Sequence, residues 1–503
     1  MKNTWDTEKR IINVSNRLPV KINVTEGNIS LQNSDGGLAT GLGSVFHKYK
    51  NIWIGWPGAE IDELRKAEVE ELLKPDHLFP VFLSKKEIDN FYEGFSNEVI
   101  WPLFHYFTSY SVYDPEYWDA YVKVNQKFAD EILLHATEDD IIWVQDYQLM
   151  LVPQMLRQAN PKLRIGYFHH IPFPSSDVLK ALPWKEQIIN GLLGADVIGF
   201  QTNNDVSHFR NAAIKIGGAS IGTDKLTVND RPVQVSCFPI SIDYEKYKDL
   251  ANSPETKRIA QKLQKQIDTK IMISIDRLDY SKGIIQRLQA FELFLKSYEE
   301  WRGKVTFIHL VVPSRENVGG YKQLKQEMNR LITDINGKYG TFDWQPIRHF
   351  YRSFPPNMLS AMYSTADLAV VTPIVDGMNL VSKEYIASNI HLNGALLLSD
   401  GAGAANELTE SILVNPNDIT SFAEKISYGL SMPTDQKQKA LRTMQKKVER
   451  ANIFMWANNF LDKLINVTAK KTSTKLVKID STLPSRIDTQ FTLPTNGAFV
   501  AGL

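Results

Sequence analysis

The sequence of 503 residues contains a single cysteine, Cys237. One cysteine cannot form an internal disulfide, and it excludes a Cys-x-x-Cys metal or redox motif. No uninterrupted apolar run approaches the length that a membrane-spanning helix requires. The N-terminal segment MKNTWDTEKR is charged and lacks the apolar stretch of a signal peptide. These features predict a soluble, cytoplasmic protein that does not associate with a membrane.

The chain also lacks an excess of charge, because 57 Lys and Arg residues balance 57 Asp and Glu residues. Without a basic balance or a recognition motif, binding to nucleic acid is not expected. No His-Glu-x-x-His motif or equivalent occurs, so no metal site is predicted. Any anion must therefore be bound by a local group of residues. The hydrophobic content of 43% is typical of a globular enzyme.

Short apolar runs alternate with longer amphipathic segments along most of the chain. The expected strands are Arg10–Val14, Ile52–Trp56, Ile141–Val144, Arg164–His169, Val197–Phe200, Val233–Phe238, Lys270–Ile275, Val305–Val312, Ile347–Tyr351, Leu368–Val371, Ala395–Ser399 and Ile412–Val414. The expected helices between them include Tyr117–Leu134, Lys185–Leu193, Ile285–Tyr298 and Tyr321–Asn336. This alternation predicts an α/β fold with parallel sheets built from βαβ units.

Twelve strands are too many for one compact domain, so we expect two α/β domains that face each other across a cleft. The boundary is expected within Pro239–Tyr247, which separates residues 1–240 from residues 241–450. A helix near residues 450–467 is expected to rejoin the first domain. Residues 468–503 have polar runs, two prolines and no amphipathic period, which is typical of an extended or disordered tail.

The segment Asp367–Ala387 is the strongest candidate for an anion-binding strand–loop–helix unit. A buried strand is ended by Thr372-Pro373, a turn with Gly377 follows, and Asn379 is a good N-cap for the next helix. Free backbone N–H groups at such a helix start can bind a diphosphate. Glu384 lies about one turn into that helix and could accept hydrogen bonds from a ribose diol. The alternative is an ordinary connection with a solvated acid.

Other strand ends carry cations. The segment Arg277–Gly283 (RLDYSKG) places Arg277 and Lys282 between a strand and a helix, where both favour a diphosphate. Arg315 follows the next expected strand, and Arg17 follows the first strand of the chain. An arginine at such a position can bind a phosphate or can simply pair with a surface acid.

Four further stretches are weaker candidates. The paired glycines Gly36-Gly37 allow close approach of a ligand but do not form a P-loop. His169 and His170 are adjacent in an expected strand, so they point to opposite faces and cannot both line one site. The aromatic-rich segment Phe91–Trp101, in a turn-like setting, suits either a sugar ring or core packing. Gly401–Glu407 is read as a tight turn, so no nicotinamide cofactor is expected.

Taken together, these motifs resemble the trehalose-6-phosphate synthase family, whose members are retaining glucosyltransferases with the two-domain GT-B architecture. The resemblance rests on VSNRLP, GGLATGL, WIGWPG, FSNEVIWPLFHY, YFHHIPFPSS, DVIGFQT, DRLDYSKG, VPSRENVGGY, INGKYG, VTPIVDGMNLVSKEY and GAGAANEL, which run from about Asn13 to about Asn459. It implies UDP-glucose or another nucleotide-glucose as the donor, glucose 6-phosphate as the acceptor, and no cofactor.

The resemblance also implies roles for individual residues. The residues implied for the acceptor are Arg17, Tyr92, Trp101, Asp146 and Arg315. Those implied for the donor are Gly36, Gly37, His170, Ile171, Arg277, Lys282, Phe354, Asp376, Leu380, Val381, Ser382, Lys383 and Glu384. The catalytic set is Asp146, His170, Arg277, Lys282 and Asp376. Phe354 is expected at the uracil ring, and Glu384 at the ribose hydroxyls.

The chemistry implied is substitution at the anomeric carbon with retention of configuration. A pair of carboxylates, as in glycosidases, is a poor fit because the leaving group is a diphosphate. Arg277 and Lys282 are expected to stabilise the departing charge. The departing phosphate oxygen is expected to take the acceptor proton, so no side-chain nucleophile is named.

The sequence departs from the family pattern at two places. The first, at Gln145 and Gln148, bears on acceptor preference, and the second, at Ser241, is read as a harmless backbone variation. The usual His-Asp-Tyr-His reads Gln145-Asp146-Tyr147-Gln148, and the usual Pro-Ile-Gly-Ile-Asp has Ser241 at its glycine. No aspartate-rich DxDGT motif occurs, so a fused phosphatase is not expected. A related synthase with another acceptor, such as a glucosylglycerol-phosphate synthase, stays open. So do a catalytically silent sugar-phosphate sensor and assembly as a homo-oligomer.

Overall fold

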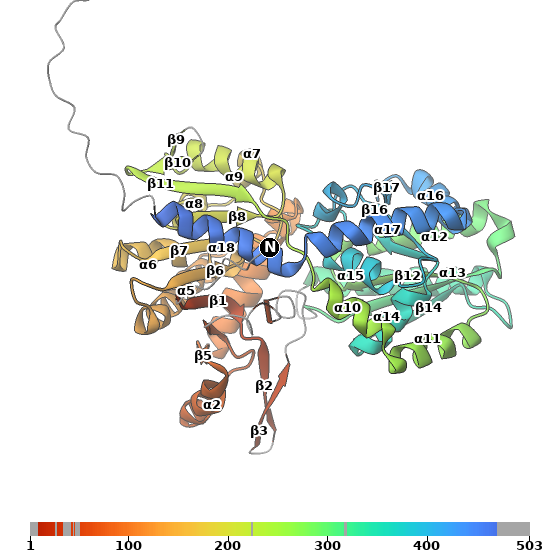
Figure 1. Cartoon of the computed structure of the whole chain (residues 1–503), viewed down its shortest axis with the longest axis horizontal. Helices are drawn as coiled ribbons and strands as arrows, with labels where there is room; N and C mark the ends of the chain where they lie inside the picture. The colour runs from red at the N-terminus through yellow and green to blue at the C-terminus, as the bar shows by residue number, and fades with distance from the viewer. Residues whose placement is uncertain are drawn as a thin grey trace, which may run out of the picture.

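The computed structural model describes residues 9–25, 28–33, 42–43, 45, 51–222, 225–315 and 319–469. Within these residues the fold is α/β, with two large sheets that stand side by side and a separate two-stranded hairpin (Figure 1). Each large sheet has helices on both faces, as in Rossmann-like domains. The fold class expected from the sequence is therefore confirmed.

The first sheet belongs to the N-terminal half of the chain. Its strand order is β5 (Leu78–Pro80), β4 (Asn51–Trp56), β1 (Ile11–Arg17), β6 (Ile141–Gln145), β7 (Arg164–Phe168), β8 (Val197–Phe200), β11 (Arg231–Cys237), β10 (Leu226–Val228) and β9 (Ser220–Ile221). The strands from β5 to β11 pair in parallel, and β10 and β9 add an antiparallel edge. The carboxyl ends of the parallel strands therefore meet at one edge of the sheet.

Alternate residues of these strands face opposite layers of helices. In β6, for example, Ile142 and Val144 pack into one core while Ile141 and Trp143 pack into another. The helices on the Val144 side include η3 (Ile88–Ile100), α4 (Trp101–Phe104), α5 (Pro115–His135), α6 (Val152–Ala159), α8 (Lys185–Leu193) and α9 (Asn203–Lys215). Because both faces are covered, the strands are continuous apolar runs.

The second sheet has the order β14 (Ile347–Tyr351), β13 (Val305–Val312), β12 (Lys270–Arg277), β15 (Leu368–Val371), β16 (Ala395–Ser399) and β17 (Ile412–Val414). All of its pairs are parallel. The helices of this half are α10 (Tyr244–Asn252), α11 (Pro254–Gln266), α12 (Ile284–Ser297), α13 (Gly319–Tyr339), α14 (Pro356–Thr365), α15 (Leu380–Ser388), α16 (Ile419–Ser431) and α17 (Thr434–Arg450). Residues that follow β12, β13 and β15 therefore meet at one edge.

The last described helix, α18 (Ile453–Ala469), returns from the second half to the first sheet (Figure 1). Its Phe460 ring stacks on Trp143 at 4.9 Å between ring centres, and Trp456 packs edge-on against Phe168 at 5.0 Å. A Cβ at Gly166 would come within 2.7 Å of the Phe460 ring, so only a glycine admits this helix. Helix α18 thus completes the core on that face of the first sheet.

Each expected strand and each named helix has a counterpart in the structure, and where the two differ, only their bounds differ. The bounds of the expected strands Val197–Phe200, Val305–Val312, Ile347–Tyr351, Leu368–Val371, Ala395–Ser399 and Ile412–Val414 agree with the structure. The expected strand Arg164–His169 ends one residue earlier, at Phe168. The segment Phe91–Trp101 is not turn-like but helical, because η3 is a π-helix that continues into α4. The last two residues of α18 extend into the stretch expected to be a tail.

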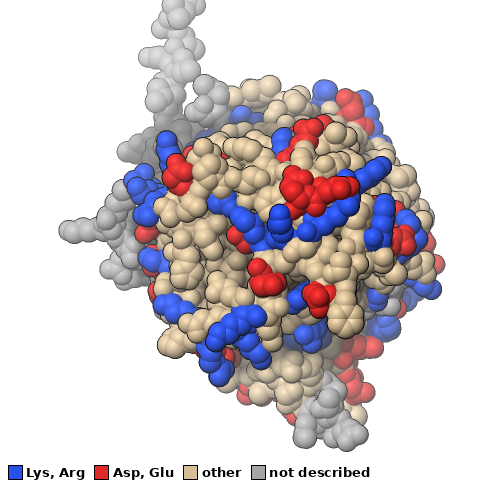
Figure 2. All heavy atoms as spheres, turned by 90° about the vertical axis from the view of Figure 1, so that its right-hand side faces the viewer, with Lys and Arg blue, Asp and Glu red and all other residues tan. Residues whose placement is uncertain are grey.

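The surface mixes charges of both signs. Figure 2 shows Lys and Arg side by side with Asp and Glu on the end of the molecule formed by the second half of the chain. Two such pairs on this half are Lys338–Glu292 and Arg330–Asp334, with N–O distances of 2.9 Å each. Among the described residues, no helix has the length and apolar character needed to cross a bilayer.

Candidate active site

Arg17 lies between two aromatic rings at the end of β1. Its guanidinium carbon is 4.7 Å from the centre of the Trp56 ring and 5.1 Å from that of Tyr92. The parallel pairing of β1 with β4 puts Arg17 opposite Trp56, and η3 supplies Tyr92. Aromatic faces hold a guanidinium in place without using its N–H groups, which stay available for an anion. Trp56 belongs to the WIGWPG motif, but the sequence did not assign it to the site.

Arg315 joins the two halves of the chain. Its guanidinium carbon stacks 3.9 Å from the centre of the Trp101 ring, and its Nη2 donates to the Tyr147 hydroxyl at 3.1 Å. Trp101 and Tyr147 come from the first half, whereas Arg315 follows β13 of the second. Tyr92 interacts electrostatically with both Tyr147 and Arg315. Tyr92 therefore lies between Arg17 and Arg315, and these two cations are neighbours.

Asp279 is the centre of this cluster, and sequence reasoning did not name it. Its two oxygens accept from Arg315 Nη1 (3.3 Å), Tyr321 Oη (3.2 Å), Trp101 Nε1 (3.4 Å) and the Ser281 backbone N–H (2.9 Å). Burial alone would raise the pKa of Asp279, but the nearby cations Arg315, Lys282 and Arg277 hold it below its usual value. Asp279 therefore stays ionised and fixes the direction of the Arg315 guanidinium.

Lys282 and Asp376 meet at the carboxyl edge of the second sheet. The Lys282 amine donates to Asp376 Oδ2, which also accepts from the Asn379 amide at 3.1 Å. Burial would raise the pKa of Asp376, but Lys282 holds it below its usual value. Arg277 ends β12 with its side chain exposed, 5.6 Å from the centre of the Trp101 ring. Arg277 and Lys282, which are expected to bind the diphosphate, thus lie close to Trp101 and Asp279.

A buried arginine supports the Lys282 loop. Arg287 is fully buried and donates to the Lys282 carbonyl (3.0 Å), to Thr372 Oγ1 (3.0 Å) and to Asp276 Oδ2 (2.6 Å). These three bonds tie the loop after β12 to the end of β15. The sequence signal for this role is a charged residue on the buried face of α12, beside Leu288.

The segment from Asn379 to Glu384 begins α15. Asn379 has φ 73° and makes no side-chain capping bond, since its amide turns to Asp376. The expected side-chain N-cap is therefore wrong. Ser382 donates to the Asn379 carbonyl at 2.8 Å, and the buried Lys383 amine donates to the Ile240 carbonyl and to Glu407. Both side chains point inward, so a nucleotide-sugar substrate could bind only to the backbone N–H groups of these two residues.

Glu384 has both carboxylate oxygens occupied by tyrosines. Tyr247 Oη donates to Oε1 at 3.0 Å, and Tyr363 Oη donates to Oε2 at 3.2 Å. Burial raises the pKa of Glu384, and these two hydrogen bonds act against the shift. Each oxygen keeps a second lone pair, so the group can still accept from a diol. Leu380 and Val381 are partly buried on the same helix.

Asp146 has a strained backbone. Its φ of 71° and ψ of 171° lie in a region that only glycine adopts readily. Its Oδ1 accepts from the His170 backbone N–H at 3.1 Å, and its own N–H donates to the Phe168 carbonyl at 2.7 Å. Burial raises the pKa of Asp146 to about 7, against the opposing effect of hydrogen bonds from the His170 and Tyr147 backbone N–H groups and of the cations Arg277 and Arg315. Strain and a raised pKa at one carboxylate are typical of a functional group.

The side chains of His169 and His170 point into different surroundings, as expected for adjacent residues of an extended chain. His169 is fully buried, whereas His170 is partly buried and its Nε2 contacts Gln145 Oε1 at 2.9 Å. The backbone carbonyl of His170 abuts Gly377, where an added Cβ would overlap it. Gly377 is thus needed for close approach and not for unusual backbone angles. Ile171 is 6% exposed next to this contact.

Phe354, Gly36 and Gly37 are the remaining residues expected at the site. Phe354 packs edge-on against Phe350 at 5.4 Å and lies under the Arg352 guanidinium at 4.4 Å. Gly36 and Gly37 lie outside the described residues. In the part of the chain that the structure describes, no three His, Cys, Asp or Glu residues gather as a metal site.

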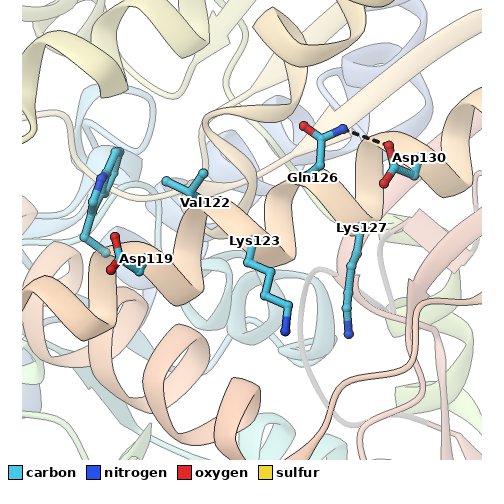
Figure 3. Close-up of a pocket in the computed structure, with 7 residues that line it drawn as sticks. Asp119, Val122, Lys123, Gln126, Lys127 and Asp130 are labelled. Carbon is cyan, nitrogen blue, oxygen red and sulfur yellow. Dashed lines mark hydrogen bonds between the residues drawn. The ribbon is translucent and has the colours of Figure 1, made fainter.

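A shallow pocket lies elsewhere, on the outer side of α5 (Figure 3). Four of its polar side chains already have partners: Gln126 donates to Asp130 at 2.7 Å, and Lys123 and Lys127 contact Glu87 at 3.1 and 2.7 Å. Trp118, which also lines this pocket, stacks on Trp184 at 5.3 Å. None of the expected site residues lines this pocket.

Two Rossmann-like domains with clustered cations at their facing sheet edges define a glycosyltransferase of the GT-B class. The chain belongs to Glycosyltransferase family 20, which residues 9–466 match.

Known members are similar over most of the chain. A bifunctional trehalose-6-phosphate synthase/phosphatase of Thermoproteus tenax is 38% identical over 92% of this chain, which spans 64% of that protein's length. The alpha,alpha-trehalose-phosphate synthase [UDP-forming] 2 of Aspergillus fumigatus is 39% identical over 93% of this chain and 99% of its own. The crystal structure of an alpha,alpha-trehalose-phosphate synthase (UDP-forming) from Burkholderia xenovorans in complex with glucose-6-phosphate has a TM-score of 0.82. It is 32% identical and covers 91% of this chain and 100% of its own.

Proposed function

We propose that the protein transfers glucose from UDP-glucose, or another nucleotide-glucose, to glucose 6-phosphate with retention of configuration. The products are α,α-trehalose 6-phosphate and the nucleoside diphosphate. The observation that carries the proposal is the pairing of two cationic groups across the domain interface. Arg17, held between Trp56 and Tyr92, and Arg315, stacked on Trp101, form one group. Arg277 and Lys282 form the other. The names of the similar enzymes agree with this reaction.

The two groups divide the work between acceptor and donor. Residues 1–240, together with the helix near 450–467, form the acceptor domain, and residues 241–450 form the donor domain. Arg17 and Arg315 bind the acceptor phosphate, Trp101 shapes the pocket, and Asp146 accepts from sugar hydroxyls. Arg277 and Lys282 bind the donor diphosphate.

Bond breaking depends on the charge that leaves with the diphosphate. Arg277 and Lys282, with the free N–H groups at the start of α15, are fixed before the reaction and stabilise this charge. The departing phosphate oxygen takes the proton of the acceptor hydroxyl on the same face of the sugar. Asp376, held ionised by Lys282, lies beside the transferred glucose and favours the positive character that develops at the anomeric carbon.

The test is product formation by the purified chain from glucose 6-phosphate and a panel of nucleotide-glucoses. A non-reducing α,α-linked disaccharide phosphate, identified by mass and by anomeric NMR, is the expected product. A Lys282→Met variant prepared in parallel excludes a contaminating enzyme. Turnover only with glycerol 3-phosphate would instead favour a glucosylglycerol-phosphate synthase. Saturable binding of glucose 6-phosphate without any product would favour a silent sensor.

A further inference from the structure

Five groups form a line of hydrogen bonds through the imidazole of His170. Gln145 Nε2 donates to Asn13 Oδ1 at 3.1 Å, and Gln145 Oε1 lies 2.9 Å from His170 Nε2. On the other side of the ring, Gln201 Nε2 lies 3.4 Å from His170 Nδ1, and Gln201 Oε1 accepts from the Ile240 backbone N–H at 2.9 Å. An amide thus stands at each nitrogen of the ring.

The backbone N–H of Ile240 sets the direction of every bond in this line. A backbone N–H can only donate, so the Gln201 oxygen must face Ile240 and the Gln201 NH₂ must face His170. Nδ1 therefore accepts and carries no proton. In the neutral ring the proton is then on Nε2, which donates to Gln145 Oε1. Protonating Nδ1 would make two donors face each other, the imidazole N–H and the Gln201 NH₂.

The other surroundings of the ring also favour the neutral form. The imidazole packs 4.6 Å from the centre of the Phe168 ring and 6.0 Å from that of Trp456. The titratable neighbours are His169 next in the chain and Asp146, whose Oδ1 accepts from the His170 backbone. Burial, with His169 adding to it, lowers the pKa of His170 to about 3.

We propose that Gln145 is a positioning residue that, together with Gln201, holds His170 as the neutral tautomer protonated at Nε2. This inference rests on the proposed function, because the family resemblance behind that function assigns His170 to the donor sugar and to the catalytic set. An imidazolium at that place would add a positive charge beside the anomeric carbon, which itself becomes positive during transfer. Gln145 stands where the family pattern has histidine, so one side chain that could titrate is replaced by an amide that cannot.

The decisive variants are Gln145→Glu and Gln201→Glu. Either carboxylate can only accept, so each stabilises a protonated His170 and raises its pKa by roughly one to three units. In the first variant a flip of the Asn13 amide supplies a donor to the new oxygen, because Asn13 Nδ2 has no partner at present among the described residues. Gln148→Glu is the matched control. Gln148 is also buried and lies three residues from Gln145. Its backbone carbonyl accepts from the Asn125 side chain, which is not part of this line.

Two readouts test the inference on the full chain. The first is the NMR spectrum of ¹⁵N-labelled histidine, with the His170 signals assigned by their loss in His170→Asn. Wild type and Gln148→Glu should show Nε2 protonated and Nδ1 unprotonated from about pH 6 to about pH 8. Both other variants should begin to show the imidazolium as the pH is lowered below about 6, toward a raised pKa of roughly 4 to 6. The second readout is the pH dependence of kcat, which should fall roughly tenfold for each pH unit below the new His170 pKa in those two variants.

The readouts separate this inference from the proposed function. An Nδ1-protonated ring in the wild type, or His170 spectra that do not change in either glutamate variant, would overturn the tautomer assignment whatever the enzyme catalyses. A changed spectrum with an unchanged pH profile would overturn the positioning role alone. Absence of turnover in the wild type would contradict the proposed function and would leave the spectroscopic result standing.

Discussion

The guanidinium of Arg315 stacks on the indole of Trp101, with 3.9 Å between the guanidinium carbon and the ring centre. One residue belongs to each half of the chain, so a single contact joins the cation proposed to bind the acceptor phosphate to an aromatic ring of the other half. Stacking leaves the planar edge of the guanidinium free for hydrogen bonds, two of which go to the hydroxyls of Tyr147 and Tyr321.

Arg315→Lys should raise the KM for glucose 6-phosphate by about 10- to 100-fold, because hydrogen bonds to charged groups contribute roughly 1.5–3 kcal/mol each. Lysine keeps the charge but cannot stack on Trp101 and donate in two directions. The KM for the donor should change much less. Steady-state kinetics with each substrate varied gives both values. Arg330→Lys, in a surface pair with Asp334, is the control, and equal acceptor KM values in the two variants would refute this role.

Replacing Arg277 or Lys282, the two cations proposed to bind the donor diphosphate (the diphosphate clamp), should nearly abolish turnover. Arg277→Ala and Lys282→Ala should each lower kcat by about 10²- to 10³-fold, the size found when a preorganised donor to a developing charge is removed. Circular dichroism and the melting temperature should show an intact fold. Lys338→Ala removes a lysine that is also paired with a carboxylate, but on the surface, and should leave kcat unchanged. Wild-type rates in either clamp variant would contradict the assignment.

Gly377→Ala should damage both stability and activity. The new methyl group would overlap the His170 carbonyl, so the two domains would have to separate at this point. Overpacking of this kind costs about 1–3 kcal/mol. The free energy of unfolding and kcat should both fall.

Gly337→Ala is the matched comparison for Gly377→Ala. Gly337 lies exposed in α13, and an added Cβ there meets nothing within 4 Å. Alanine in a helix interior should stabilise the protein by about 0.5–1 kcal/mol. If Gly377→Ala were as stable and active as Gly337→Ala, the contact would not be needed.

Asp146→Asn should make the protein inactive but more stable, and the gain should depend on pH. The pKa of Asp146 is about 7 in the folded state and about 3.9 in an unfolded chain. Between these values the folded state binds more protons, so this group lowers the stability of the wild type as pH rises. Asparagine does not titrate. The difference in unfolding free energy should therefore grow from about pH 4 to about pH 7 and then stay constant, whereas a difference independent of pH would contradict the raised pKa.

The buried parallel strands could be predicted from the sequence because they read as apolar runs bounded by turn residues. The strands that were missed have another character. The hairpin β2 (Val20–Thr25) and β3 (Asn28–Asn33) alternates apolar and polar residues, a strand pattern that a reading for continuous apolar runs misses. Strands β5, β9 and β10 have only two or three residues, which is too short for a periodic signal.

Parts of the site were harder to predict for a different reason. Arg277, Lys282 and Asp376 lie at strand ends, which a reading of strand–loop–helix patterns locates directly. Asp279 and Arg287 act through other residues, and their importance depends on which strands become neighbours. The same holds for Trp56, which reaches Arg17 only because β4 pairs with β1. Spacing along the chain does not encode such contacts.

The return of α18 to the first sheet has a consequence for the order in which the protein forms on the ribosome. The first sheet is synthesised through Cys237, but the helix that covers Trp143 and Phe168 begins only at Ile453. At roughly 5–20 residues per second, these rings wait about 10 to 40 seconds for Phe460 and Trp456. During that time the second sheet can be completed while the first still exposes an apolar face. We therefore expect the nascent chain to need protection by chaperones until α18 has emerged.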